Sequence, residues 1–350
     1  MKRIIIALLL TIVLVTGVFA QSPTYDEMVT AFSGFADAIA PVLPFNASVG
    51  LNWSDAFIGK LFRIPPHLGV GVTVGVTTIP FKSMETVIDT FNITIPPELS
   101  FLQKYGLPLP AYTAEARIGG ILLPFDIGLK LGILPEELLK QQGLPFSAEY
   151  LLFGADVRLS ILKERFLIPG ISIGAGLNYL QGGVGLTGLM GGDITLTQFD
   201  VPDATAPDGF VTHTLSLSDP SLKFNWNTTV FDFKVQVSKS LLILTPYAGL
   251  GASIGGSKAG GGLFTELLLD GSPITDQQIQ EINDAFAAAG ETPPDLSTTG
   301  IQVSSEVQGW SVRAFGGVSL NLLILRIDLT GMYNFTGNSY GVTGNVRIQL

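Results

Sequence analysis

Acidic and basic side chains recur close together in segments whose other residues alternate between apolar and polar types. Glu115 and Arg117 stand two residues apart, and so do Asp156 and Arg158. Side chains two residues apart share one face of a β-strand, because successive strand side chains point to opposite faces. We expect these opposite charges to neutralise each other on one face, as they would in a confined polar space.

The same two-face alternation occurs in six segments, and their charged residues define one predicted polar, lumen-facing surface. They are Glu115, Arg117, Asp126, Lys130, Asp156, Arg158, Asp232, Lys234, Arg326, Asp328 and Arg347. The stretch HLGVGVTVGVTT at 67–78 alternates without charges, with aliphatic residues facing a run of glycine and threonine. Each segment therefore predicts a strand with one apolar face and one polar or nearly bare face.

Two architectures fit this alternation. A soluble sandwich turns its apolar faces inward, whereas a transmembrane barrel turns them outward to lipid. Only 14% of the residues are charged, whereas soluble domains carry about a quarter, and the apolar faces are long and unbroken. The fold class that we predict is all-β, a transmembrane antiparallel up-and-down β-barrel of about 10–14 strands.

Short and long links alternate along residues 67–350, as in barrels with short periplasmic turns and long extracellular loops. The long outer loops are expected at 81–110, 183–222 and 257–306. The segments 193–199 and 209–218 either cross the membrane or form a hairpin above it. Aromatic residues near strand ends are candidates for interfacial anchors or for ordinary packing. They are Phe125, Trp226, Trp310, Tyr333, Phe335 and Tyr340.

Residues 1–20 have the pattern of a secretory signal peptide. Lys2 and Arg3 precede the apolar run IIIALLLTIVLV, and a small-residue cleavage site ends at Ala20. The chain contains no cysteine, which excludes disulfides, cysteine-ligated metals and a lipid-anchored lipoprotein. We expect an exported protein of the bacterial outer membrane.

Residues 21–66 precede the first clear strand. Thr24 and Glu27 form a candidate capping box, helical spacing follows, and Pro41 ends the pattern, so a helix is expected at 26–40. This segment either plugs the lumen beside the bare glycine and threonine faces or covers the membrane surface or the periplasmic mouth. A second short helix is expected in the longest outer loop, where Thr275 and Gln278 form another candidate capping box.

The residues offer little for catalysis. His67 and His213 are the only histidines, and His213 lies near Asp208 and Asp219 in the sequence. A base with an orienting carboxylate would suit a membrane hydrolase, but no nucleophile motif accompanies it. We expect no enzyme activity, no cofactor and no metal. The net charge of −10 argues against a nucleic-acid partner.

The signal peptide, the alternating strands and the terminal NVRIQL resemble the outer-membrane β-barrel proteins of diderm bacteria. The resemblance implies lipid and the barrel-insertion machinery as partners. Many such barrels end in an aromatic residue, whereas this chain ends in Leu350. The N-terminal segment also gives the layout a likeness to the long-chain fatty-acid transporter family, whose members carry an N-terminal hatch in the lumen.

The leading functional expectation is a porin-like channel or transporter for a small solute, with hydrophobic solutes among the candidates. Polarity of the lumen would be set by the charged residues above. A structural or adhesive surface barrel without transport is the first alternative, and an outer-membrane hydrolase that uses His213 is the second.

Overall fold

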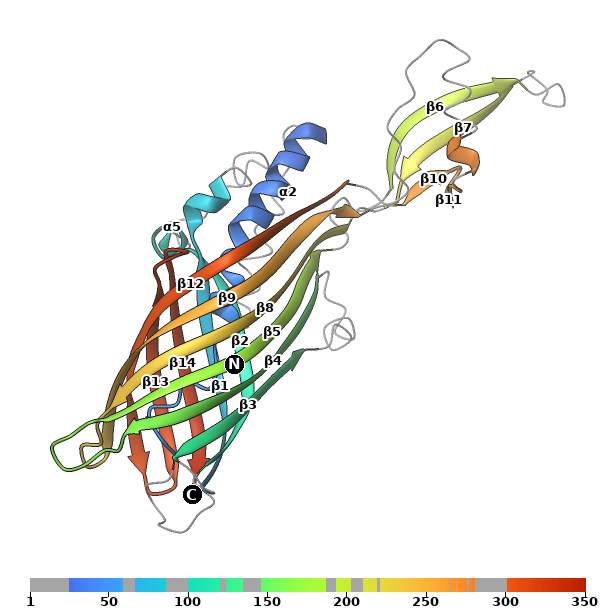
Figure 1. Cartoon of the computed structure of the whole chain (residues 1–350). Coiled ribbons are helices and arrows are strands. Elements are labelled where there is room, and N and C mark those ends of the chain that lie inside the picture. Colours follow the sequence, from blue (N-terminus) through green and yellow to red (C-terminus); the bar gives the residue numbers. More distant parts are fainter. Residues whose placement is uncertain are drawn as a thin grey trace.

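The computed structural model describes residues 25–58, 67–85, 100–119, 124–134, 146–186, 193–202, 210–218, 221–264, 266–275, 277–280 and 301–350. Ten strands close into one barrel (Figure 1). They are β1 (His67–Ile79), β2 (Leu107–Gly119), β3 (Phe125–Leu134), β4 (Phe146–Leu162), β5 (Gly170–Leu186), β8 (Ser221–Ser238), β9 (Leu244–Phe264), β12 (Ile301–Leu322), β13 (Leu325–Asn334) and β14 (Ser339–Gln349). The expected antiparallel barrel is confirmed, at the lower end of the expected strand number.

The barrel closes through its first and last strands. β14 pairs antiparallel with β1, with Val72 opposite Val346, and every other neighbouring pair is antiparallel as well. Because strands of one chain pair around the whole circumference, no strand edge is left open to lipid, which a membrane-spanning sheet requires. The links β2–β3, β4–β5, β8–β9 and β12–β13 lie at one end, where the chain also ends (Figure 1).

Four further strands among the described residues lie outside the barrel. β6 (Ile194–Pro202) and β7 (Phe210–Leu217) form the hairpin that was one of the two expectations for this region. With β10 (Leu267–Leu269) and β11 (Ser272–Pro273) they make a four-stranded sheet beyond the long-link end (Figure 1). The long links therefore carry a small folded unit of their own.

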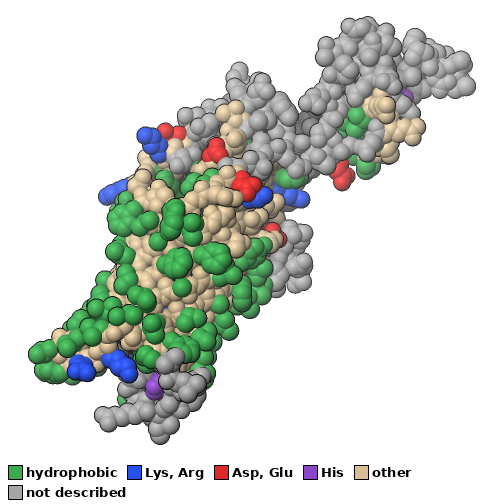
Figure 2. Space-filling view, in the orientation of Figure 1, with side chains coloured by type: hydrophobic (Ala, Val, Ile, Leu, Met, Phe, Trp, Pro, Cys, Tyr) green, Lys and Arg blue, Asp and Glu red, His purple; other side chains and the backbone are tan. Residues whose placement is uncertain are grey.

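The alternation of side chains places the apolar face outside. On β1, Val70 and Val74 are 49% and 61% exposed, whereas Thr73 between them is 3% exposed. Green apolar side chains cover much of the barrel surface in Figure 2. A wall of exposed valine, leucine, isoleucine and phenylalanine around a closed sheet is the surface of a transmembrane barrel.

The long strands extend past the apolar band. On the outer face of β8, exposed polar residues stop at Thr229 and exposed apolar ones begin at Phe231. β9 and β12 contain 21 and 22 residues, about twice the length that crosses a bilayer. Trp310 is 59% exposed on the outer face of β12, as an interfacial anchor would be. Trp226 is 7% exposed and faces inward, so its candidacy as an anchor is wrong.

The helices of the described residues contain at most 15 residues. α2 (Tyr25–Ile39) and α3 (Leu43–Ala47) precede the barrel, and η1 (Phe81–Met84) and α5 (Phe101–Tyr105) lie in the β1–β2 link. Among the described residues, no helix is long and apolar enough to cross a membrane. Thr275 and Gln278 form the expected capping box. The backbone N–H and the hydroxyl of Thr275 donate to Gln278 Oε1, and the backbone N–H of Gln278 donates to Thr275 Oγ1. Thr24 and most of the loop helix lie outside the described residues.

The cysteine-free chain permits a direct test of the barrel's orientation. Single cysteines at Val72, Leu129 and Val235, each carrying a nitroxide, are expected to collide with oxygen more than with an aqueous nickel complex in vesicles. Asn225, exposed on β8 beyond the apolar band, should show the reverse order. Power-saturation EPR gives both collision rates, and preferential access of the nickel complex to the first three sites would refute the orientation.

Candidate functional site

The lumen of the barrel is the candidate site, and the N-terminal segment fills it. α2 lies at the long-link mouth against β9 and β12, and α3 lies deeper, against β8, β9, β5, β1 and β12. Residues 48–58 continue toward the other end without regular secondary structure. All described residues from 42 to 56 are buried. Of the two expectations for this segment, residues 42–58 fit the one inside the lumen, while α2 lies at the mouth; residues 21–24 and 59–66 lie outside the described residues.

The layer of the lumen near the long links is apolar. Phe32, Ala36 and Ile39 of α2 pack against Leu152, Leu180, Phe224, Trp226, Val230 and Ala259, all on the inner face of the wall. The rings of Phe35 and Phe224 are 4.0 Å apart between centroids, and those of Phe32 and Phe224 meet edge to face at 5.8 Å. Burial of this apolar surface holds α2 in the mouth.

A second apolar contact lies one step deeper, at α3. Val42, Phe45 and Val49 meet Ala111, Tyr247, Phe315 and Met332 of the wall. Asn46 of the same turn donates to the Thr77 hydroxyl at 2.8 Å. The polar contact marks the level at which the wall changes from apolar to charged.

Below this level the wall carries a buried network of charges. Asp126 accepts hydrogen bonds from Arg117 and, at 2.9 and 3.0 Å, from Arg158. Asp156 accepts from Arg117 at 2.7 Å and pairs with Lys234 Nζ at 2.8 Å. These five residues come from β2, β3, β4 and β8, whose inward side chains meet across the lumen surface.

Two further ion pairs complete the charged layer. Arg313 binds Asp232 through two bonds of 2.7 and 2.8 Å, and Ser253 donates to the same carboxylate at 2.6 Å. Arg347 binds Asp328 on the neighbouring strand. Sequence reasoning missed Arg313, because no acid lies near it in WSVRAFGG. The alternation along β12 could have revealed it, because Arg313 shares the inner face with Ser311 and Phe315.

The predicted pairing at a spacing of two residues is wrong for Glu115 and Arg117. Arg117 binds carboxylates of β3 and β4, and Glu115 accepts instead from hydroxyls of Thr73 and Thr113, at 2.5 and 2.7 Å. Gly128 lies directly opposite Arg117 and leaves room for its long side chain, which reaches diagonally to Asp126 and past β3 to Asp156. All eleven predicted lumen residues lie on the inner face, at most 8% exposed, including Arg326 near the short-turn rim.

The charged wall also holds the backbone of the N-terminal segment. Its donors bind carbonyls that have no partner in a helix or sheet. The bonds are Lys130 Nζ to Ala47 O (2.7 Å) and Val49 O (2.6 Å), Lys234 Nζ to Leu51 O (2.9 Å), Arg158 Nη1 to Asp55 O (2.7 Å), and Gln236 Nε2 to Trp53 O (2.7 Å) and Ser54 O (3.0 Å). Irregular backbone at membrane depth requires such partners.

Trp53 lies at the centre of the charged layer. Its indole Nε1 donates to Glu115 at 2.5 Å, and the guanidinium carbons of Arg117 and Arg347 lie 5.6 and 4.9 Å from its ring centroid. A Cβ at Gly69 would stand 2.6 Å from the ring, so the bare face of β1 provides the space that the ring fills. The indole thus contacts both a carboxylate and two cations, which suits its polar edge and π-face.

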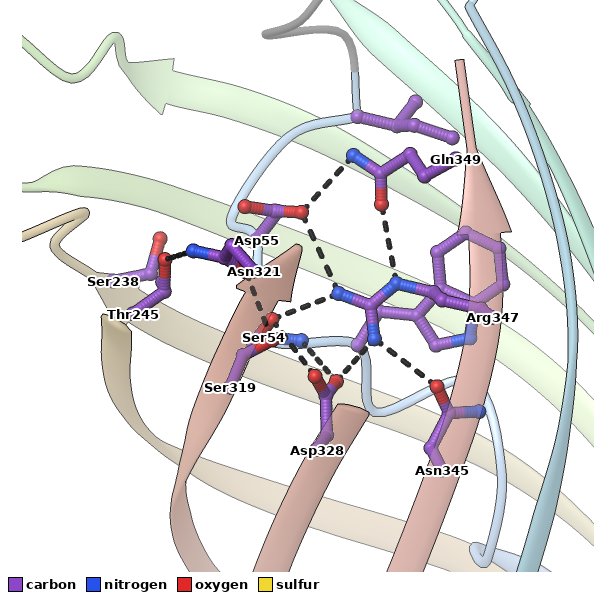
Figure 3. A network of polar contacts seen from close by, with 12 residues as sticks. Ser54, Asp55, Ser238, Thr245, Ser319, Asn321, Asp328, Asn345, Arg347 and Gln349 are labelled. Carbon is purple, nitrogen blue, oxygen red and sulfur yellow. Dashed lines mark hydrogen bonds and ion pairs between the residues drawn. The ribbon is translucent and has the colours of Figure 1, made fainter. Parts of the chain in front are cut away.

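The network around Asp55 ties the segment to the last strand (Figure 3). Asp55 accepts from Gln349 Nε2 at 3.0 Å and lies 3.5 Å from Arg347 Nη2. The same nitrogen donates to Ser54 Oγ at 2.8 Å, and Ser54 N donates to Asp328 at 3.2 Å. Asp55 is fully buried and was not predicted, because its sequence context NWSDAF carries no strand pattern.

His213 lies far from the lumen, on β7 of the outer sheet. Its Nδ1 is 2.6 Å from Asp270 Oδ2. The backbone N–H of Thr214, and next the bond from His213, lower the pKa of Asp270 below its ordinary value. Asp208 and Asp219, the carboxylates near His213 in the sequence, lie outside the described residues.

A scan against protein-family models found no match, and a search of curated proteins found none. Among solved structures, the chain is similar to the translocator domain of autotransporter NalP from Neisseria meningitidis, with a TM-score of 0.33 and 10% identity over 91% of this chain and 98% of that one. It is also similar to the monoaromatic hydrocarbon channel CymD, with a TM-score of 0.21 and 8% identity over 82% and 88%. No function is carried over at these scores. The chain's own geometry defines its class: a transmembrane β-barrel with a filled lumen.

Asp126, whose carboxylate accepts from both Arg117 and Arg158, allows a direct test of stability. Asp126→Asn removes the charge that two buried guanidinium groups share, and we expect a loss of about 3–5 kcal/mol in the free energy of unfolding. Urea titration in lipid vesicles measures it. Glu306→Gln, in the exposed pair with Lys258, is the matched control and should cost at most about 1 kcal/mol. Equal effects of the two variants would contradict the buried network.

Proposed function

We propose that this chain is an outer-membrane channel or transporter that passes a small solute when its N-terminal segment shifts within or leaves the lumen. The observation that carries the proposal is the kind of contact in the charged layer. Side chains of the wall hold the segment there through its backbone carbonyls, alongside contacts to the side chains of Trp53, Ser54 and Asp55. Water can replace such bonds when the segment moves. A bond from a neutral amide such as Gln236 contributes only about 0.5–1.5 kcal/mol net, and one from a cation such as Lys130 about 1.5–3 kcal/mol.

The wall is also largely satisfied without the segment. Arg117 and Arg158 both bind Asp126, and Arg313 binds Asp232. A permanent core would need no such independent pairing, since the segment itself could supply the partners. The self-paired wall therefore supports a lumen that can be emptied while these ion pairs stay intact; Lys130, whose bonds go to segment carbonyls, would exchange them for water.

The lining of an emptied lumen would be weakly cationic. Its buried wall charges among the described residues comprise seven cations and five acids. The cations are Arg117, Lys130, Arg158, Lys234, Arg313, Arg326 and Arg347, and the acids are Glu115, Asp126, Asp156, Asp232 and Asp328. A ring of excess positive charge favours anions in a narrow pore. The apolar layer above it would accept the apolar part of a solute.

Weakening the segment's anchors should open the channel. Lys130→Met with Gln236→Leu removes four bonds to segment carbonyls and leaves the wall ion pairs intact. We expect planar-bilayer conductance to rise above that of the wild type and to prefer anions. Thr228→Val, which affects only wall bonds to Gly256 and Ser257, is the control and should leave conductance unchanged. A folded double variant without conductance or liposome uptake would count against transport.

An engineered disulfide should close the same path. A Cβ at Gly170 would lie 3.4 Å from Cβ of Ala56, close to the roughly 3.5–4.5 Å of natural disulfides. In the weakened variant, Ala56→Cys with Gly170→Cys should abolish conductance under oxidation and restore it with reductant. Each single cysteine variant serves as a control, and its conductance should be the same under oxidation and reduction. Conductance that persists through the oxidised lock would show that the segment does not gate the path.

The four-stranded sheet favours one second candidate, a surface-exposed binding role. β6, β7, β10 and β11 pair only with one another and are not needed to close the barrel. Replacing residues 193–218 by a short linker should then abolish binding to a surface partner and leave conductance as it is. A deletion variant that loses conductance but still binds the surface partner would favour the channel over the surface-binding role.

A further inference from the structure

Three neighbouring turns at the short-link end expose unusually large apolar side chains. We call them the apolar rim, defined as residues 166–168, 241–243 and 322–324. Phe166 is 92% exposed, Leu242 is 99% exposed and Leu323 is 84% exposed. Lipid-facing residues of the wall reach no more than about two thirds of that, such as Val74 at 61%. The rim therefore projects beyond the wall.

The backbone of two of these turns is strained to present leucine. Leu242 and Leu323 have φ angles of 54° and 55°, in the left-handed region that favours glycine and asparagine. At the opposite end of the barrel, the β13–β14 turn places Asn338 in the same conformation, with φ of 47°. The short-link turns thus carry leucine where a polar residue would be both less strained and better hydrated.

The rim is rigid because the turns are bonded to each other. Ser240 N donates to Glu164 Oε1 at 2.9 Å, and Lys239 Nζ donates to Arg165 O at 2.5 Å, which joins the β8–β9 turn to the β4–β5 turn. Asn321 N donates to Ile243 O at 2.7 Å, which joins the β12–β13 turn to the β8–β9 turn. A fixed apolar surface results, rather than three independent loops.

Two observations identify what covers this surface. The rim continues the lipid-facing wall, since outward Val237 leads into Leu241 along one strand and turn. Exposed Lys163 and Arg165 stand beside it, and Figure 2 shows blue side chains beneath the green tip at the lower left. Apolar side chains next to exposed cations match acyl chains next to lipid phosphates.

We propose that the apolar rim is a membrane anchor, inserted into the phospholipid leaflet that surrounds this end of the barrel. The leucines and Phe166 lie among acyl chains, and Lys163 and Arg165 bind phosphates of the headgroups. The anchor fixes the depth of the barrel in the membrane. It is independent of whether the lumen conducts.

Replacing the two strained leucines distinguishes a rim that lies in lipid from a rim that lies in water. Leu242→Asn with Leu323→Asn relieves the backbone strain, so in water the change would stabilise the barrel or leave it unaffected. In lipid it should instead lower the ratio of folded to unfolded protein in vesicles by about ten-fold or more, measured by urea titration. Val235→Asn in the lipid-facing wall should lower this ratio as well, whereas Phe101→Asn at the other end of the barrel should leave it unchanged. An unchanged or raised midpoint in the double variant would overturn the proposal.

A nitroxide at position 242 gives an independent readout that does not depend on stability. We expect it to collide with oxygen more than with an aqueous nickel complex in vesicles of phosphatidylethanolamine and phosphatidylglycerol. Preferential access of the nickel complex would place the rim in water, ready for a protein partner instead, and would overturn the anchor. Lys163→Gln with Arg165→Gln should remove the stabilisation that phosphatidylglycerol adds, whereas Lys82→Gln should keep it. If phosphatidylglycerol still stabilises the double variant as it does the wild type, the phosphate contacts are refuted.

Discussion

A charged side chain on a membrane-crossing strand has only one place to go, the lumen. Strand alternation sends the other face to lipid, where a charge near the middle of the bilayer costs about 2–4 kcal/mol. Inside, the same charge is removed from water by the N-terminal segment, and Arg117 and Arg347 are 0% and 1% exposed. Buried charges must be paired, so the register between strands, which decides which charges meet, is the constraint on which the rest of the structure depends.

The register explains why the pairs run across the sheet. β3 brings Asp126 opposite Arg158 of β4, and opposite Gly119 of β2, two residues from Arg117. One carboxylate can then serve two guanidinium groups. Glycines beside these side chains give them room, since a Cβ at Gly128 would stand 2.7 Å from Arg117. Small residues on the inner face are therefore part of the charged network.

Much of this architecture could be predicted from the sequence, because alternation and link length are local properties. The inner face, the hairpin as one of two options and the helix before Pro41 followed from them. The partners did not, because register depends on contacts between distant strands. Asp126 lies 32 residues from Arg158, and Asp55 lies 292 residues from Arg347. Trp226 was misplaced because composition did not reveal that β8 extends unbroken back to Ser221, which gives Trp226 the same inward parity as Asp232.

The two layers of the lumen hold the N-terminal segment by different forces. α2 is held by apolar burial against Phe224 and its neighbours, whereas residues 47–58 are held by hydrogen bonds from the wall. Displacing the lower part exposes the Trp53 ring but exchanges most of its contacts for bonds to water, whereas displacing α2 exposes Phe32 together with Phe224 and its apolar neighbours. The lower part is thus the easier one to release. In a channel of this design, α2 would remain in the mouth as a tether while the charged layer opens beneath it.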